Sequence, residues 1–533
     1  MELKASLREP SIKMRFLNLL HKYLCIFVSF VLDQIYGEKP RQSMPPINDI
    51  TLNEPATTIA EKIRTKQITS RQVVLTFIER IKEVNPVLNC VVGERYEEAL
   101  LDAAKVDQFI SSNEFDVEEL RETKPFLGVP ISTKECIGID GMIQSCGLWS
   151  RRAVRSTEDA DVIQLMRNAG AIPFVTTNVP PLLAWCESAN KIYGRTLNPY
   201  DTKRSAGGSS GGEAALLAAA GSPLGIGSDI GGSIRMPALF NGIFGHKPSP
   251  HIVSNNGHYP NPNGAGEMLA LTIGPMSRFA SDLKPMLKVL AGDKAKHLAL
   301  DEPVNLSSLN YFYQEDSGEH FVSSLDEDMW GAMNSAILHF STNVDTYPKR
   351  VKMEKLAHSM SLATACLLDK NSVDFESQLA NMNGRINPFI ELLKWCMGKS
   401  EHTLPSLLFA FQQRLIFFKF NSPEHRAMLE ECEELRREFD EMLGDNGVFI
   451  YPAYPTIAPY HNEAIFSPIN YSYNIIFNVL GLPSTSVPIG LGYHNMPVGV
   501  QVIANRNKDR LCLAVASEFE RLCGGWLPTS SVV

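Results

Sequence analysis

The chain has 533 residues, of which 44% are hydrophobic and 20% charged, so it can bury a large core. Length alone would allow two or more domains. The formal net charge of −9 argues against a nucleic-acid partner, because neutralising phosphates requires a basic surface.

The ten cysteines are scattered along the chain, without a CxxC motif and without histidines at zinc-binding spacing. This pattern predicts free thiols in a reducing compartment. It gives no reason to expect a metal or an organic cofactor.

The N-terminal segment is the first candidate element. Residues 16–32 are mostly apolar, follow two basic residues, and are interrupted by His21 and Lys22. The uninterrupted part, 23–32, is only half of the ~20 residues that span a bilayer comfortably. We predict that residues 1–40 form a membrane anchor, either a short span or a helix lying in the membrane plane. The alternatives are a cleaved signal peptide, for which the A-x-A site is missing, and a helix packed on the protein body.

Two helices are predicted next. Thr69 and Gln72 form a T-x-x-Q capping box, and the helix that they begin should stop at Pro86. A second helix is predicted at 97–110, followed by a charged, solvated connection at 111–124. We assign these elements to the scaffold.

Lys134 follows an apolar, extended run in FLGVPISTKECIGIDG, which predicts the carboxyl end of a buried strand. A lysine there can act as a base only if burial lowers its pKa from about 10.4 towards 7–8. The alternative is a surface lysine at a strand end. Cys136, two residues later, is a candidate for a functional thiol or a small packed residue.

A strand, a helix and a strand are predicted in short succession after Lys134. Asp161 is expected to cap the helix, and Gly170 to end it before a strand at 171–178. This order predicts parallel pairing and an α/β class.

A glycine-rich stretch, 204–247, holds 11 of the chain's 36 glycines. Ser209 and Ser233 stand beside glycines, where small residues leave backbone N–H groups free to face an anion. Acyl transfer requires such a hydroxyl as nucleophile and such N–H groups for the oxyanion. Since no histidine precedes His246 in this stretch, the base must come from elsewhere, and Lys134 completes a candidate Ser-Ser-Lys triad. Alternatively, the serines satisfy turn amides or cap a helix.

Three motifs resemble the amidase signature family: GGSSGGE at 207–213, GSDIGGSIRMPA at 227–238 and the lysine of PISTKE. The chain is similar to this family from about residue 51 to its end. Two further segments and the apolar N-terminus resemble the fatty-acid amide hydrolase 2 type of the family: CESANKIYGRTLNPYD at 186–201 and FNGIFGHKPSP at 240–250. The resemblance implies an α/β amidase-signature fold, a large mixed twisted β-sheet surrounded by α-helices, in one catalytic domain at 41–533.

The resemblance also implies roles for the triad. Ser233 would be the nucleophile, Ser209 the bridging serine and Lys134 the base. The oxyanion hole would consist of the backbone N–H groups of Ile230, Gly231, Gly232 and Ser233. Asp229 and Arg235 would fix this loop rather than take part in the chemistry.

The implied reaction is hydrolysis of long-chain fatty-acid amides to a fatty acid and an amine or ammonia through an acyl-Ser233 intermediate, without cofactor or metal. The implied partners are a small-molecule lipid amide and a membrane. Whether the chain forms a homodimer is left open. The apolar N-terminus predicts a membrane-associated protein. The basic residues before the apolar run and the cysteine usage favour a catalytic domain that faces the cytosol. An endomembrane and a lipid droplet both fit.

Three alternatives to this function stay open. In the first alternative, the enzyme acts on small or aryl amides or esters instead of fatty-acid amides. Residues 207–211 also fit the G-x-S-x-G nucleophile elbow of α/β-hydrolases, although that motif should follow a strand and none is predicted before it. In the third alternative, the chain is a catalytically silent amidase-like scaffold or an amidotransferase subunit. The intact triad argues against a silent scaffold, and the apolar N-terminus argues against a soluble subunit.

The second half contains one unusually apolar stretch, 403–420, which is either ordinary core or an apolar cap that sits on a membrane or lines an acyl channel. Residues 427–443 predict a strongly charged, solvent-facing helix. Asp509 is expected to cap a last helix that Gly524 stops. Three C-terminal segments predict strands and proline turns that return to the sheet and line the pocket: 448–459, 477–490 and 496–504.

Overall fold

The computed structural model describes residues 12–37, 41–112, 115–344, 346–370, 372–414 and 419–530. The strands are β1 (Val91–Glu94), β2 (Pro130–Lys134), β3 (Ile172–Thr177), β4 (Ala189–Asn190), β5 (Gly194–Arg195), β6 (Leu224–Asp229), β7 (Phe244–Lys247), β8 (Thr272–Ser277), β9 (Asn310–Tyr313), β10 (Lys349–Arg350), β11 (Gly447–Pro452), β12 (Ser484–Leu491) and β13 (Pro497–Ala504). The α-helices are α1 (Ile12–Tyr36), α2 (Ala56–Arg64), α3 (Ser70–Leu88), α4 (Tyr96–Ser112), α5 (Val117–Thr123), α6 (Asp161–Asn168), α7 (Gly211–Ala218), α8 (Arg235–Phe240), α9 (Ala265–Ala270), α10 (Ala280–Ala291), α11 (Glu327–Asn343), α12 (Ser359–Leu367), α13 (Phe375–Leu379), α14 (Pro388–Cys396), α15 (Leu404–Arg414), α16 (Pro423–Leu443), α17 (Ser472–Val479) and α18 (Asp509–Cys523).

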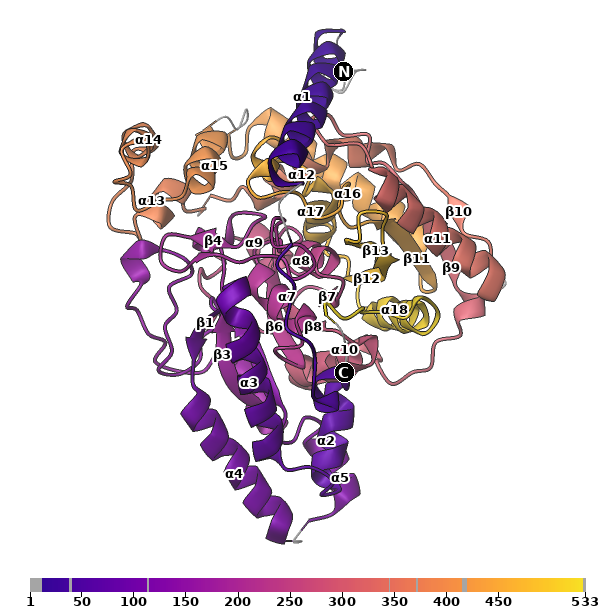
Figure 1. The fold of residues 1–533 in the computed structure, drawn as a ribbon. Helices are drawn as coiled ribbons and strands as arrows, with labels where there is room; N and C mark the ends of the chain where they lie inside the picture. Colours follow the sequence, from indigo (N-terminus) through magenta and orange to yellow (C-terminus); the bar gives the residue numbers. More distant parts are fainter. Residues whose placement is uncertain are drawn as a thin grey trace.

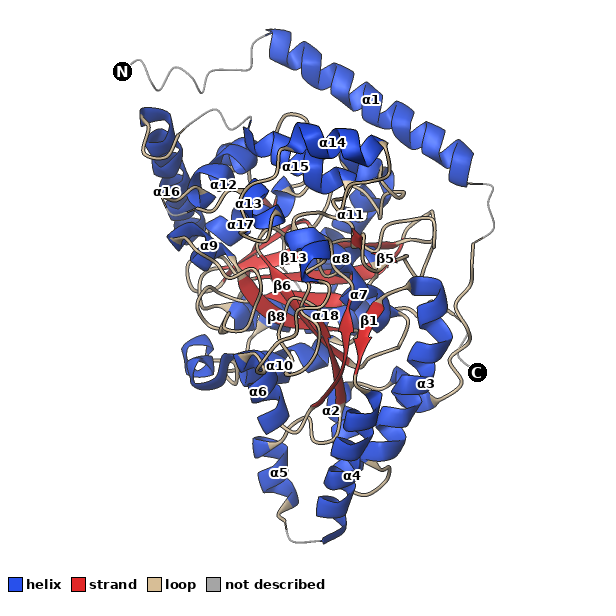
Figure 2. Ribbon diagram, turned by 90° about the vertical axis from the view of Figure 1, so that its left-hand side faces the viewer, coloured by secondary structure: helices blue, strands red, loops and turns tan. Residues whose placement is uncertain are grey.

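Within the described residues, eleven strands form one mixed sheet in the order β1-β3-β2-β6-β8-β7-β12-β13-β11-β9-β10. β2 pairs in parallel with β3 and β6, whereas the strands from β6 to β11 along this order pair antiparallel. Figure 2 shows the sheet at the centre of the molecule with helices around it. The predicted fold, a mixed sheet surrounded by α-helices, is confirmed.

The three parallel strands β2, β3 and β6 are buried along their whole length. Helix α7 packs against all three of them, and α3 also contacts β2. Because β2 and β6 are parallel neighbours, their carboxyl ends meet at one edge of the sheet. Lys134 is the last residue of β2, as predicted.

The capping box of α3 is confirmed: the Thr69 side chain accepts the backbone N–H of Gln72, and the Gln72 side chain accepts that of Thr69. The predicted stop at Pro86 is wrong, because the helix continues through it to Leu88. A proline this close to the carboxyl end costs a single backbone hydrogen bond. Asn89, in the left-handed conformation, ends the helix.

Two aspartates that were predicted to cap helices do not. Asp161 and Asp509 are the first helical residues of α6 and α18, whose N-caps are Ala160 and Lys508. The carboxylate of Asp161 accepts the hydroxyl of Ser254 at 2.6 Å instead. The glycines predicted to end these helices, Gly170 and Gly524, do adopt positive φ angles of 89° and 82°.

Three predictions about exposed or extended segments were wrong. The connection at 111–124 contains α5. Helix α16 begins at Pro423, and it buries one face through Cys432, Leu435 and Phe439, so it is amphipathic rather than wholly solvent-facing. Residues 477–479 belong to α17 rather than to a strand.

The apolar stretch 403–420 forms α15 up to Arg414, and its residues 415–418 lie outside the described part of the chain. Leu407 and Ala410 are buried, and Phe411 packs edge-on against Phe389 of α14 with ring centroids 4.7 Å apart. The exposed apolar face belongs to α14 and its C-cap Met397, with Phe389, Ile390, Leu393 and Met397 all more than half accessible.

Helix α1 is long and apolar enough to cross a membrane by length and composition, although a signal sequence would pass the same test. Phe16, Ile26 and Phe27 are 58%, 65% and 63% exposed. Figures 1 and 2 place α1, α14 and α15 at the same end of the molecule, opposite to α4 and α5.

One face of α1 rests on the protein body. The side-chain oxygen of Asn18 accepts the backbone N–H of Phe321 at 2.8 Å, and His21 contacts a backbone carbonyl at 2.9 Å. Near the other end of the helix, Asp33 accepts the hydroxyl of Tyr460 at 2.7 Å. At 1.5 Å per residue, these contacts extend over about 20 Å of the helix.

Candidate active site

The site lies where three segments meet at the carboxyl ends of β2 and β6. Lys134 ends β2, residues 206–210 lead into α7, and residues 230–234 connect β6 to α8. The two serine-bearing loops touch, because the backbone N–H of Ser210 donates to the carbonyl oxygen of Ser233 at 3.1 Å. The fold thus gathers the three residues of the predicted triad in one place.

Lys134 is fully buried, and its Nζ lies 2.6 Å from Ser209 Oγ. Its other partners belong to Ser228, whose Oγ is 3.0 Å and whose carbonyl oxygen is 3.2 Å from Nζ. Burial lowers the pKa of Lys134 below its ordinary value, because desolvation disfavours the charged ammonium. Four acidic groups oppose this shift without cancelling it, those of Cys136, Cys146, Asp229 and Glu213.

Ser233 differs from its two partners in exposure. It is 8% accessible, whereas Lys134 and Ser209 are both 0% accessible. A residue that attacks a substrate must be reachable from outside, while the groups that activate it need not be. The arrangement therefore suits attack by Ser233 with Ser209 and Lys134 behind it.

The loop from Ile230 to Ser233 is held by the carboxylate of Asp229. Asp229 Oδ1 accepts the N–H of Gly232 at 2.7 Å, and Oδ2 accepts that of Ile234 at 3.0 Å. Gly232, which was predicted as part of the oxyanion hole, therefore uses its N–H inside the loop. No hydrogen bond between described residues takes up the N–H groups of Ile230, Gly231 or Ser233.

Arg235 pairs with Asp229 at 3.0 Å, and both side chains are fully buried. Burial alone would raise the pKa of the Asp229 carboxyl, but the charge and hydrogen bonds of Arg235 more than compensate and hold it well below its usual range. The guanidinium also donates to Gln501 Oε1 at 3.0 Å and to the side chain of Asn478. Strand β13 and helix α17, far along the chain, thus brace this loop.

Glu213 ties the first turn of α7 to the sheet. Its carboxylate accepts the hydroxyls of Ser132 in β2 and of Thr177 in β3. Burial raises its pKa to about 7. Because α7 begins directly after Ser210, these bonds fix the position of the Ser209 loop relative to Lys134.

The family model described as Amidase matches residues 72–513. The chain belongs to the amidase signature family. It is 43% identical over 475 residues to Fatty-acid amide hydrolase 2 of Homo sapiens, covering 88% of this chain and 89% of that protein. It is 39% identical over 510 residues to Fatty-acid amide hydrolase 2-A of Danio rerio, covering 94% and 95%. The solved structure titled Fatty acid amide hydrolase covers 95% of this chain with a TM-score of 0.72, and at 22% identity it shows the shared fold.

As a member of this family, the chain is a hydrolase that acts on amide bonds. In this amidase no strand directly precedes residues 207–211. Just before them, Arg204 and Ser205 form only isolated bridges, with Tyr460 and Leu197. The condition for a nucleophile elbow is therefore not met. Burial raises the pKa of the Cys136 thiol to about 11, which supports its interpretation as a packed residue of this amidase.

The sequence did not predict two polar residues that lie beside the candidate triad. Ser228 contacts Lys134 directly, and His258 Nε2 lies 3.0 Å from Ser228 Oγ. Ser228 stands inside the GSDIGGS motif, next to Asp229, so its place beside the site could have been noted. His258 has no such signal, because its loop reaches Ser228 only through the tertiary fold.

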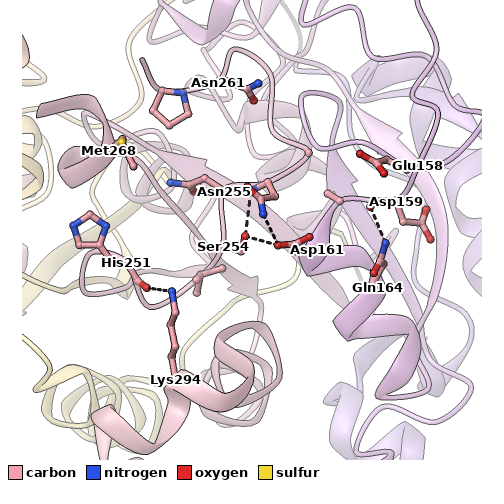
Figure 3. A pocket seen from close by; sticks show the side chains of 15 residues that line it. Glu158, Asp159, Asp161, Gln164, His251, Ser254, Asn255, Asn261, Met268 and Lys294 are labelled. Atoms are coloured by element: carbon pink, nitrogen blue, oxygen red, sulfur yellow. Dashed lines mark hydrogen bonds between the residues drawn. The ribbon is translucent and has the colours of Figure 1, made fainter. Parts of the chain in front are cut away.

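A pocket of about 640 Å³ lies outside the triad, and Figure 3 shows its polar lining. The carboxylates of Glu158, Asp159 and Asp161 line it together with Ser254 and Asn255. None of the triad residues lines this pocket. An acidic, open hollow suits water and polar solutes rather than an acyl chain.

Proposed function

We propose that the chain is a serine amidase that hydrolyses long-chain fatty-acid amides through an acyl-Ser233 intermediate. The observation that carries this proposal is the 2.6 Å contact between the buried Lys134 Nζ and Ser209 Oγ, beside the more exposed Ser233. A lysine whose pKa is lowered by burial is the base that such a triad requires.

In the proposed reaction, neutral Lys134 takes the proton of Ser209 while Ser209 takes that of Ser233, whose oxygen attacks the amide carbonyl. The oxyanion is stabilised by the N–H groups of Ile230, Gly231 and Ser233, each of which would be worth on the order of 10²–10³ in rate. The Gly232 N–H, bound to Asp229, holds the loop in shape.

Breakdown of the tetrahedral intermediate needs the proton relay to run backwards. Ser209 gives its proton to the leaving nitrogen, because an amine leaves poorly unless it is protonated, and Lys134 restores the Ser209 hydroxyl. Water then hydrolyses the acyl-Ser233 ester and regenerates the enzyme. No step of this sequence uses a cofactor or a metal.

The long-chain substrate is supported by the names of the similar proteins and by the apolar surfaces of α1 and α14. A substrate with a long acyl chain resides in a membrane, so an enzyme that acts on it gains from a membrane-facing surface. We assign residues 1–40 to a membrane anchor and 41–533 to the catalytic domain, with that domain on the cytosolic side.

The contacts that α1 makes with the body from Asn18 to Asp33 favour a helix lying in the membrane plane over one that crosses it. A crossing helix would have to leave the body along most of its length. In the in-plane arrangement, the body-facing side keeps its hydrogen bonds while Phe16, Ile26 and Phe27 enter the lipid.

The test is mass spectrometry of the intact protein after reaction with a long-chain fluorophosphonate, for wild type, Ser233→Ala and Lys134→Ala, followed by turnover of oleamide and acetamide. We expect one adduct on Ser233, slow labelling without Lys134, and preference for oleamide. Preference for acetamide would reject the lipid substrate. Labelling of Ser209 that does not need Lys134 would favour the nucleophile elbow, and absence of labelling would favour a silent scaffold.

A further inference from the structure

A hydrogen-bonded chain leads from Lys134 away from the triad. Ser228 Oγ lies 3.0 Å from Lys134 Nζ and 3.0 Å from His258 Nε2. The other ring nitrogen, His258 Nδ1, lies 2.9 Å from the carbonyl oxygen of Pro260. Lys134, Ser228 and His258 are all at least 98% buried, so solvent does not compete for these bonds.

The direction of each bond follows from the groups at the ends of this chain. A carbonyl oxygen only accepts, so His258 Nδ1 carries the proton that is donated to Pro260. Burial, with a smaller contribution from the charge of Lys134, lowers the pKa of His258 to about 4, so the ring is neutral at pH 7 and Nε2 carries no proton. Nε2 is then an acceptor, and the Ser228 hydroxyl must donate to it.

This direction decides where the lone pair of Lys134 points. A neutral lysine has two N–H donors and one lone pair. The carbonyl oxygen of Ser228 can only accept, and Ser228 Oγ also accepts because its own proton is bound to His258. Both N–H donors are thereby used, which leaves the lone pair for the hydroxyl of Ser209 at 2.6 Å.

We propose that His258 is a positioning residue for acyl transfer, which accepts the hydroxyl proton of Ser228 and thereby directs the lone pair of Lys134 to Ser209. The inference rests on the proposed function and deepens it. Without His258, the Ser228 hydroxyl can donate to Lys134, because its other neighbour, Cys136 Sγ at 3.7 Å, is a weak acceptor. Lys134 would then donate an N–H to Ser209 and would be unable to take its proton.

The backbone around His258 is fastened to the segment that follows Lys134. Ile137 and His258 form an isolated β-bridge, and the N–H of Gly138 donates to the carbonyl oxygen of Gly257 at 2.9 Å. On the pocket side of the same loop, Asp161 accepts the hydroxyl of Ser254 at 2.6 Å, as Figure 3 shows. The loop therefore holds the imidazole in a fixed place relative to the base.

Four proteins test the proposal: wild type, His258→Phe, His258→Gln and the double variant Ser228→Ala/His258→Phe. Phenylalanine fills the space without an acceptor, whereas the side-chain oxygen of glutamine can still accept the Ser228 hydroxyl. The measurements are kcat/KM for oleamide and the rate of Ser233 labelling by a short-chain fluorophosphonate, both as a function of pH. His258→Leu replaces the phenylalanine variant if that variant does not fold.

For His258→Phe we expect the high-pH plateau of kcat/KM to fall about 10- to 100-fold, part of the 10²–10⁴ that a positioned base contributes. The pH range over which kcat/KM rises to this plateau, its acid limb, should move to lower pH. The reason is that a hydrogen bond donated to the neutral amine of Lys134 favours the neutral form over the ammonium. A site that is merely loosened would admit water to Lys134 and move the limb to higher pH. Glutamine should restore the plateau to within a few-fold of wild type.

The double variant gives the sharpest result. Removing the Ser228 hydroxyl removes the competing donor, so Ser228→Ala/His258→Phe should be more active than His258→Phe alone. An unchanged plateau in His258→Phe would overturn the proposal. A rise of kcat/KM that moves to higher pH in His258→Phe would also overturn it, as would a double variant no better than His258→Phe. Failure of the proposed function is distinct, because wild type itself would then show no labelling of Ser233 and no amide turnover.

Discussion

Lys134 determines the pH dependence that the site should show. Only a neutral lysine can accept a proton, and burial lowers the pKa of this one, so kcat/KM should rise with pH through that lowered pKa and then level off. Lys134→Ala should reduce kcat by about 10²–10⁴ and abolish the rise. The measurement is the initial rate of oleamide hydrolysis across the pH range in which the protein stays folded.

Lys247 provides a matched control for this prediction. It is also fully buried, and burial together with the charge of Arg235 lowers its pKa to about 7. Among the described residues, its amine donates to the carbonyl oxygen of Pro248 and to no other group. Lys247→Met should leave the rise of kcat/KM at the wild-type pH. The role assigned to Lys134 would be refuted if the rise disappeared in Lys247→Met and persisted in Lys134→Ala.

The ion pair of Asp229 and Arg235 should be one of the most sensitive points of the molecule. Arg235→Met leaves the carboxylate of Asp229 buried without its counter-charge, which typically costs about 3–5 kcal/mol of unfolding free energy. Denaturant unfolding measures this loss. The exposed pair of Lys288 and Asp301 is the control, since Lys288→Met should cost less than about 1 kcal/mol. Similar losses in both variants would show that the buried pair does not stabilise the loop.

At the level of elements, the turn between β6 and α8 depends on one glycine more than on its neighbour. Gly232 has a φ angle of +108°, and a Cβ there would lie 2.5 Å from the Cβ of Asn474 in α17. The nearest neighbours of a Cβ on Gly231 would be atoms of the Ile475 side chain, at an ordinary 3.4 Å. Gly232→Ala should therefore lower the unfolding free energy by about 1–3 kcal/mol, and Gly231→Ala by clearly less.

Thermal or denaturant unfolding of both alanine variants checks this prediction. Labelling of Ser233 by a fluorophosphonate should also slow in Gly232→Ala, because any shift that relieves the clash with Asn474 moves the Ser233 N–H. Equal stability of the two variants would mean that the turn adapts freely, contrary to its bracing by α17.

The sequence predicted those site residues that lie within contiguous sequence motifs. Lys134 could be placed at the end of a buried strand, and Ser209 and Ser233 in glycine-rich loops, because strand ends and loops have local signatures. Ser228 and His258 were missed as partners of Lys134, since their contact depends on the pairing of β2 with β6 and on a loop far along the chain. Pairing of that kind leaves no local pattern.

Element boundaries were predicted less well, for a physical reason. Asp161 and Asp509 have the residue type of an N-cap, but an acid in the first turn is equally favoured by the helix dipole, and tertiary partners decide between the two positions. Pro86 was predicted to stop α3, but a proline in the last turn of a helix removes only one backbone hydrogen bond. The exposed face of α14 was missed because its short apolar run resembles ordinary core.

For the whole molecule, the exposed apolar faces of α1 and α14 lie at the same end. Figure 1 shows α1 beyond the body at the end that also carries α14 and α15. The side chains of α14, including Phe389 and Leu393, are also exposed at this end. Two apolar elements at one end would bind a membrane more tightly than either alone. The proposed orientation follows, with the end that bears α4 and α5 directed away from the lipid.

Helix α1 should bind lipid through its outward face while it stays on the body. Phe27→Asp/Phe30→Asp places two charges on that face and should lower binding to phosphatidylcholine vesicles at least about tenfold, since each buried aromatic contributes roughly 1.5–3 kcal/mol. His21→Ala, on the body-facing side, is the control and should bind as wild type does. Labelling of Ser233 by a short-chain fluorophosphonate should survive in both. An epitope placed before Met1 then separates the two arrangements, because external protease removes it from an in-plane helix, whereas a helix that crosses the bilayer protects it.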